Sequence, residues 1–292
     1  MKTALIVLGV QRSGTSVTSH VLSQLGVNFG NSNHFIQFDH NPIFFELAWV
    51  NAINNQIIQQ LGYQYTDFFL PVEQDFEAKQ FLTLEQELIA KIEQEWHDCL
   101  CIGIKDPRIS LTFPIWKKVL SAQGYLIQVI HVFRSPTNFL KSNQKLFHNW
   151  EGWTSHRHLN FWLQLNLAAV YFTRHYRKHY VNYDRLMQFP QTEVEQTALQ
   201  CQLSSANISE AVQVIQTDHY HHQEWVGTDN VWVDECYQKL CDKALSPSDY
   251  LHYRNQVESQ LIRLERMTDL PEIKRSDGAT PVIESEDCAA TA

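Results

Sequence analysis

The sequence contains little that would indicate a secreted, membrane-spanning or nucleic-acid-binding protein. Its 292 residues include six cysteines. None forms a C-x-x-C pair, so we expect reduced thiols in a cytoplasmic protein. Lys and Arg number 23 against 32 Asp and Glu, and the resulting net charge of −9 disfavours nucleic acid as a partner. The apolar run at residues 4–10 is too short for a membrane span or a signal peptide, and we expect a strand there.

This apolar run leads directly into a short polar turn at residues 8–16, Leu-Gly-Val-Gln-Arg-Ser-Gly-Thr-Ser. The run has β-branched residues and no helical period, which predicts a buried strand of a parallel sheet. After the turn, apolar residues recur at helical spacing, and Gly26 is placed to end that helix. A strand, a tight turn and a helix N-terminus together bind phosphate, because free backbone N–H groups and the helix dipole both point at the anion.

The turn lacks the lysine of the nucleotide-triphosphatase P-loop. Gly9 and Gly14 have the P-loop spacing, but Thr15 stands where the lysine belongs, which argues against a triphosphate substrate. The cation of this turn is Arg12 instead. We therefore expect an anion cradle for a single 5′-phosphate with a further anionic group attached, made by Arg12, Ser13, Gly14, Thr15 and Ser16.

Residues 11–16 resemble the 5′-phosphosulfate loop, [KR]-S-G-T-[ST], of the sulfotransferases, which use 3′-phosphoadenosine 5′-phosphosulfate (PAPS). Residues 105–108, Lys-Asp-Pro-Arg, are similar to the K-[DE]-P-[RF] segment that follows a buried strand in that family. Arg134, Pro136 and Ser142 match the spacing of its 3′-phosphate motif, R-x-P-x5-S. Residues 181–190 resemble V-x-Y-[ED]-x-L…P, an element near the cofactor, and this implies that Tyr183 lies at the cofactor.

A further segment, residues 41–46, resembles N-P-x-G-[FYW]-[FW]-E of bacterial sulfotransferases, with Phe44 replacing the glycine. We expect a helix from residue 41 to Leu61, with Glu46 in its first turns. The resemblance implies that Glu46 is the general base, and the alternatives are His34 and His40 in the preceding loop. Arg12 and Lys105, with backbone N–H groups, are expected to stabilise charge on the bridging and leaving oxygens, so no metal is required.

We predict a three-layer α/β fold with a central parallel sheet, the P-loop NTPase-like fold of the sulfotransferases. The expected strands are residues 4–10, 99–104, 125–133 and 180–183. The expected later helices are residues 72–96, 113–122, 136–147, 150–176, 190–217 and 229–269. The domain is predicted to span residues 1–268 and to be followed by a disordered tail, residues 269–292. Residues 219–222, His-Tyr-His-His, have no second ligand group at a recognisable spacing, so we do not expect a metal site.

The resemblance implies transfer of a sulfuryl group from PAPS to a hydroxyl or amine of a small-molecule or glycan acceptor. One alternative is a P-loop kinase, for which Asp106 is the one obvious strand-terminal carboxylate for magnesium. The other is a nucleotide-binding protein without catalysis, in which Glu46 would be replaceable. The family's R-K-G-x-x-G loop is absent from the C-terminal third, which leaves part of the 3′-phosphate site unassigned.

Overall fold

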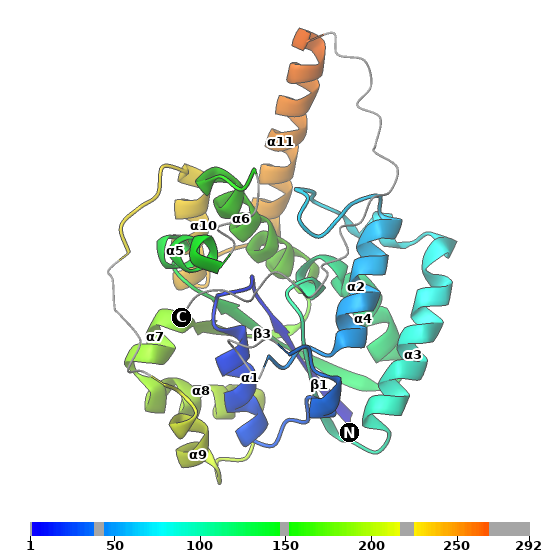
Figure 1. The fold of residues 1–292 in the computed structure, drawn as a ribbon, viewed down its shortest axis with the longest axis vertical. Coiled ribbons are helices and arrows are strands. Elements are labelled where there is room, and N and C mark those ends of the chain that lie inside the picture. The colour runs from blue at the N-terminus through cyan, green and yellow to red at the C-terminus, as the bar shows by residue number, and fades with distance from the viewer. Residues whose placement is uncertain (1, 38–43, 147–151, 217–224, 269–292) are drawn as a thin grey trace, which may run out of the picture. The chain divides into compact units, whose positions relative to one another are not determined.

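The structure of the protein is a computed structural model, which describes residues 2–37, 44–146, 152–216 and 225–268 (Figure 1). Contacts within the chain divide it into two compact units, Met1–Leu251 and His252–Ala292. The first unit carries every residue predicted to act. The described part of the second unit is the C-terminal portion of helix α11 (Pro247–Thr268). The predicted disordered tail, residues 269–292, lies outside the described residues.

Four parallel strands form the central sheet in the order β2-β1-β3-β4. They are β1 (Lys2–Leu8), β2 (Cys101–Lys105), β3 (Tyr125–Phe133) and β4 (Arg177–Asn182). Because the strands are parallel, their carboxyl ends share one edge of the sheet, where ligands bind in folds of this class. The register sets this edge: Val7 pairs with Lys105, and Leu8 pairs with His131.

Helices cover both faces of the sheet, which confirms the predicted α/β fold with a central parallel sheet (Figure 1). One face packs against α1 (Thr15–Gln24), α7 (Tyr183–Gln188), α8 (Pro190–Cys201) and α9 (Ile208–Gln213). The other face packs against α4 (Ile109–Ala122), which lies beside α6 (Ser155–Phe172). Four more helices pack against this pair: α2 (Ala48–Gln60), α3 (Leu82–Trp96), α5 (Pro136–Leu146) and α10 (Val231–Cys241).

The segment around Glu46 differs from the sequence-based prediction. Helix α2 begins at Ala48, so Glu46 lies before the helix and not in its first turns. The helix starts late because Phe45 has a φ of 55°, outside the helical range, and Leu47 forms an antiparallel bridge with Phe35. Residues 41–43 lie outside the described residues.

Several other boundaries also differ from prediction. Residues 72–96 do not form one helix: two short 3₁₀ helices, Glu73–Phe76 and Lys79–Phe81, precede α3. Helix α4 begins four residues early, and α6 begins at Ser155, where the Thr154 side chain accepts a hydrogen bond from the Arg157 N–H. The predicted helix 190–217 is divided after Gln202, whose φ is 57°. The predicted helix 229–269 is divided near Lys243, whose φ is 55°.

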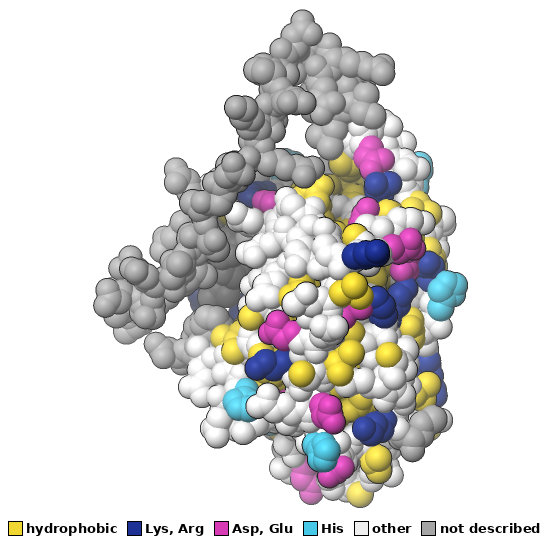
Figure 2. Space-filling model, turned by 90° about the vertical axis from the view of Figure 1, so that its right-hand side faces the viewer, with side chains coloured by type: hydrophobic (Ala, Val, Ile, Leu, Met, Phe, Trp, Pro, Cys, Tyr) yellow, Lys and Arg dark blue, Asp and Glu magenta, His cyan; other side chains and the backbone are white. Residues whose placement is uncertain are grey.

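In the parts of the chain that the structure describes, no helix combines the length and the apolar character needed to cross a membrane. On the face shown in Figure 2, acidic and basic side chains of described residues are intermingled.

Candidate functional site

The turn between β1 and α1 has a conformation that its glycines make possible. Gly9, Arg12 and Gly14 all have positive φ, at 142°, 66° and 90°. A Cβ atom at Gly9 would lie 2.1 Å from the Val132 carbonyl oxygen, and one at Gly14 would lie 2.1 Å from the Tyr183 ring. The Ser13 N–H donates to the Val10 carbonyl at 3.2 Å and closes the turn. The N-terminal amide groups of α1 therefore stand directly at the carboxyl edge of the sheet.

Arg12 brings this turn into contact with the predicted 3′-phosphate motif. Arg12 Nε donates to Ser142 Oγ on α5 at 3.1 Å, and Arg134 donates to the Arg12 carbonyl at 3.4 Å. The Arg134 guanidinium lies 4.6 Å from the centroid of the Tyr183 ring. Burial and, to a lesser extent, the charge of Arg134 lower the pKa of Arg12. Two guanidinium groups thus lie near each other, an arrangement that an anion would stabilise.

Asp184 fixes the turn that carries Arg134. It accepts hydrogen bonds from the Ser135 N–H at 3.1 Å and from Asn138 Nδ2 at 3.3 Å. Its own backbone N–H is held by the Asn182 side chain at 2.9 Å, at the start of α7. The sequence contained Asp184 within a motif, but the structure shows that it connects the end of β4 to the start of α5.

Lys105 is the second cation beside the turn. Its ammonium lies 3.3 Å from Ser16 Oγ, 3.0 Å from the Phe44 carbonyl oxygen and 2.5 Å from Glu46 Oε1. The side chains of Lys105 and Glu46 are 1% and 7% exposed. Burial raises the pKa of Glu46, whereas the Lys105 ammonium opposes this effect. Lys105 therefore connects the start of α1, through Ser16, to the carboxylate that was predicted to act as a base.

Sequence reasoning missed a network that lies next to this pair. Asp106 accepts hydrogen bonds from the Arg108 N–H at 2.7 Å and from its guanidinium at 3.3 Å. The Arg108 guanidinium lies 4.2 Å from the centroid of the Tyr65 ring, and Arg108 Nε donates to Asn55 at 2.7 Å. Tyr65 in turn donates to the Gln11 side chain at 2.8 Å. No motif or period in the sequence distinguished Tyr65, which joins the anion turn to the turn after β2.

No protein-family model matches this sequence, and no curated protein matches it. Three solved structures of similar fold are sulfotransferases or sulfotransferase domains. The sulfotransferase domain from the curacin biosynthetic pathway is 14% identical, with a TM-score of 0.44 over 88% of this chain and 98% of that chain. Sulfotransferase STF9 from Mycobacterium avium is 13% identical, with a TM-score of 0.46, and the match covers 83% of this chain and 76% of that chain. The sulfotransferase domain from the Synechococcus PCC 7002 olefin synthase is 14% identical, with a TM-score of 0.43, and the match covers 88% of this chain and 96% of that chain.

Of the two histidines predicted as alternative bases, His34 contacts Glu95. His34 Nδ1 lies 2.8 Å from Glu95 Oε2, and Glu95 also accepts hydrogen bonds from the Asn31 N–H and from Trp49 Nε1. Glu95 belongs to the last turn of α3, shortly before the amino end of β2, whereas Lys105 stands at its carboxyl end. The His34 imidazole is therefore engaged by Glu95, although the backbone of the same segment contacts Glu46, because the Ile36 N–H donates to the Glu46 carbonyl at 2.8 Å. His40 and residues 219–222 lie outside the described residues, within which no three His, Cys, Asp or Glu side chains are gathered around a possible metal position.

Proposed function

We propose that this protein is a sulfotransferase that moves a sulfuryl group from PAPS to the hydroxyl or amine of a small-molecule or glycan acceptor. The observation that carries the proposal is the contact of Arg12 with both Ser142 and Arg134. These residues belong to two motifs that were predicted for two different anions. A nucleotide with anionic groups at both its 5′ and 3′ positions fits such a paired site, whereas AMP would use only half of it.

The residues around the turn fit this donor. Ser13 Oγ is buried and has no hydrogen-bond partner among the residues that the structure describes, so a polar ligand group would satisfy it. The 5′ phosphosulfate would be held by Arg12, Ser13, Gly14, Thr15 and Ser16. The 3′-phosphate would be held by Arg134 and Ser142, and Tyr183, whose ring lies against Arg134, would lie at the nucleotide.

In the proposed reaction, Glu46 accepts the proton of the acceptor hydroxyl as its oxygen bonds to sulfur. The bond between sulfur and the bridging phosphate oxygen breaks, and 3′,5′-ADP leaves with that electron pair. Burial favours this role because it raises the pKa of Glu46 and so makes the carboxylate a stronger base. Once Glu46 is protonated, Lys105 loses its anionic partner. Its ammonium, already 3.3 Å from Ser16 Oγ, can then stabilise charge on the bridging oxygen together with Arg12.

The kinase alternative is disfavoured by the surroundings of Asp106. A kinase of this class needs a strand-terminal carboxylate that is available to magnesium. The Asp106 side chain is fully buried and already accepts hydrogen bonds from the backbone and the guanidinium of Arg108. These contacts favour a structural role for Asp106 in the turn after β2.

Calorimetric titration with 3′,5′-ADP, AMP and ATP–Mg tests the proposal. We expect 3′,5′-ADP to bind much more tightly than AMP, because charge-assisted contacts of the 3′-phosphate contribute on the order of 1.5–3 kcal/mol each. Arg134→Ala should then weaken 3′,5′-ADP binding at least about tenfold and leave AMP binding nearly unchanged. A matched control is Arg185→Ala, because the Arg185 side chain is 57% exposed and its partner is Glu193, whose side chain is 6% exposed. Equal affinities of the wild type for 3′,5′-ADP and AMP would refute the 3′-phosphate site.

A further inference from the structure

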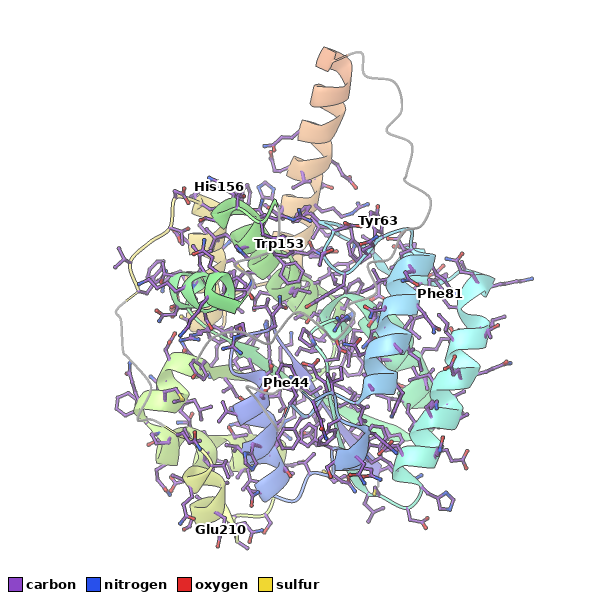
Figure 3. All side chains as sticks on the ribbon, in the orientation of Figure 1. Phe44, Tyr63, Phe81, Trp153, His156 and Glu210 are labelled. Atoms are coloured by element: carbon purple, nitrogen blue, oxygen red, sulfur yellow. The ribbon has the colours of Figure 1, made fainter. Side chains whose placement is uncertain are left out.

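The Phe44 ring lies over the ammonium of Lys105, which is paired with Glu46. The Lys105 ammonium lies 4.5 Å from the centroid of the Phe44 ring and 3.0 Å from the Phe44 carbonyl oxygen. Phe44 is itself only partly buried, whereas the Lys105 side chain is 1% exposed. Figure 3 labels Phe44 near the centre of the view, within the first unit. One residue therefore contributes both an acceptor and an apolar face to the same ammonium.

The backbone after Phe44 holds this cover in place. Phe45 has a φ of 55°, a conformation that is uncommon for an aromatic residue, and its side chain is 6% exposed. Its ring is packed against Phe29, Phe35 and His20, with centroid distances of 5.3, 5.5 and 5.6 Å. This left-handed residue separates Phe44 from Glu46. It allows the carbonyl of one and the carboxylate of the other to meet the Lys105 ammonium.

We propose that Phe44 is a water-excluding cover over Lys105 and Glu46, which an acceptor displaces when it binds. This inference rests on the proposed sulfotransferase function. Phe44 stands where the similar bacterial segment has a glycine, so the cover is a property of this chain. Its location predicts a role in specificity: only an acceptor able to move the ring away from Lys105 gains access to Glu46.

The cover would suppress a side reaction of the donor. If water reached Glu46, its oxygen could bond to sulfur while the bond from sulfur to the bridging phosphate oxygen broke. The products would be sulfate, 3′,5′-ADP and the two protons of the water, and the donor would be lost without transfer. Exclusion of water is the general means by which enzymes prevent such hydrolysis. An aromatic ring over the ammonium would provide this exclusion, and the face of the ring attracts the positive charge beneath it.

The first test measures the accessibility of Lys105 and needs no nucleotide. The wild type, Phe44→Ala and Phe44→Tyr are treated briefly by reductive methylation, and modification of Lys105 is measured by peptide mass spectrometry. We expect Phe44→Ala to raise the modification rate of Lys105 about tenfold, a factor between those of an exposed and of a desolvated cation–π contact, and Phe44→Tyr to retain protection. Lys118, whose side chain is 58% exposed, provides an internal reference that should not change. Equal protection of Lys105 in all three proteins would refute the cover.

The second test measures release of sulfate from PAPS in the absence of acceptor. Phe44→Ala should hydrolyse the donor about tenfold faster than the wild type, with unchanged affinity for 3′,5′-ADP. The control is Phe189→Ala, which removes an aromatic ring that is 53% exposed and lies under Arg185. If circular dichroism shows that Phe44→Ala is unfolded, Phe44→Leu replaces it, because leucine keeps apolar bulk but lacks the ring. The same direction of change is expected.

The two tests separate the cover from the proposed function. If the wild type binds no 3′,5′-ADP and releases no sulfate, the sulfotransferase proposal fails, whereas the methylation rates still decide whether Phe44 protects Lys105. If the wild type binds 3′,5′-ADP but hydrolysis does not increase on loss of the ring, the cover is refuted and the proposed function stands.

Discussion

The substitution Gly14→Ala tests the contact on which the geometry of the anion turn depends. Gly14 has a φ of 90°, and a Cβ there would lie 2.1 Å from Tyr183 Cδ2. A left-handed conformation costs a non-glycine residue about 1–2 kcal/mol. Displacing a packed ring adds about 1–3 kcal/mol. We therefore expect Gly14→Ala to lower the free energy of unfolding by about 3.5 kcal/mol, the middle of the summed range.

Two further variants separate these contributions. Gly26 also has a positive φ, 95°, but a Cβ there would meet nothing within 4 Å. Gly26→Ala should therefore cost only the conformational part, about 1–2 kcal/mol. Tyr183→Ala removes the ring, so Gly14→Ala made in that background should also cost only about 1–2 kcal/mol. Urea unfolding of the single and double variants gives the coupling energy directly.

The same variants connect stability to binding. A displaced Tyr183 ring would move away from the Arg134 guanidinium, which lies 4.6 Å from its centroid. Gly14→Ala should consequently weaken 3′,5′-ADP binding, and Gly26→Ala should not. A Gly14→Ala variant no less stable than Gly26→Ala, or a coupling energy of zero with Tyr183→Ala, would refute this account of the turn.

Three further substitutions address catalysis and pH. Arg12→Ala should reduce turnover far more than it reduces the affinity for 3′,5′-ADP, because this product has lost the sulfuryl group that Arg12 would stabilise. If turnover measured by kinetics and affinity measured by calorimetry fell in proportion, Arg12 would only bind the phosphate. Glu46→Gln should lower turnover about 100-fold or more and preserve nucleotide binding. The free energy of unfolding should also fall, because the buried Lys105 ammonium then has a neutral partner. Near-wild-type turnover would exclude Glu46 as the base. Burial lowers the pKa of His131 to about 3 in the folded protein, compared with about 6.5 in the unfolded chain. The stability that the neutral imidazole contributes is therefore complete above pH 6.5 and is lost as the pH falls from there toward 3. Relative to the wild type, His131→Gln should lose roughly 2 kcal/mol less stability between pH 7.5 and pH 5, as measured by urea unfolding; an identical loss would contradict a neutral, buried His131.

The sequence determined the features of this protein that depend on neighbouring residues. Residues 125–133, rich in Ile and Val, predicted β3 with its observed bounds, because β-branched apolar side chains favour a buried strand. The strand, turn and helix around Gly9 and Gly14 were also predictable, since glycine readily adopts the positive φ angles found at those two positions. Parallel pairing of β2, β1 and β3 places the segments that follow these strands, with Arg12, Lys105 and Arg134, at one edge of the sheet.

Tertiary structure decided the contacts that have no local signal. Tyr65 reaches Gln11 from 54 positions away, and His34 binds Glu95 from 61 positions away. No period or spacing encodes such pairs, because they depend on how whole elements pack. The same reason explains why Glu46 was wrongly placed on a helix: its apolar neighbours fit a helical period. The packing of Phe45, the bridge between Phe35 and Leu47 and the hydrogen bond from Lys105 to the Phe44 carbonyl hold that backbone in a different conformation.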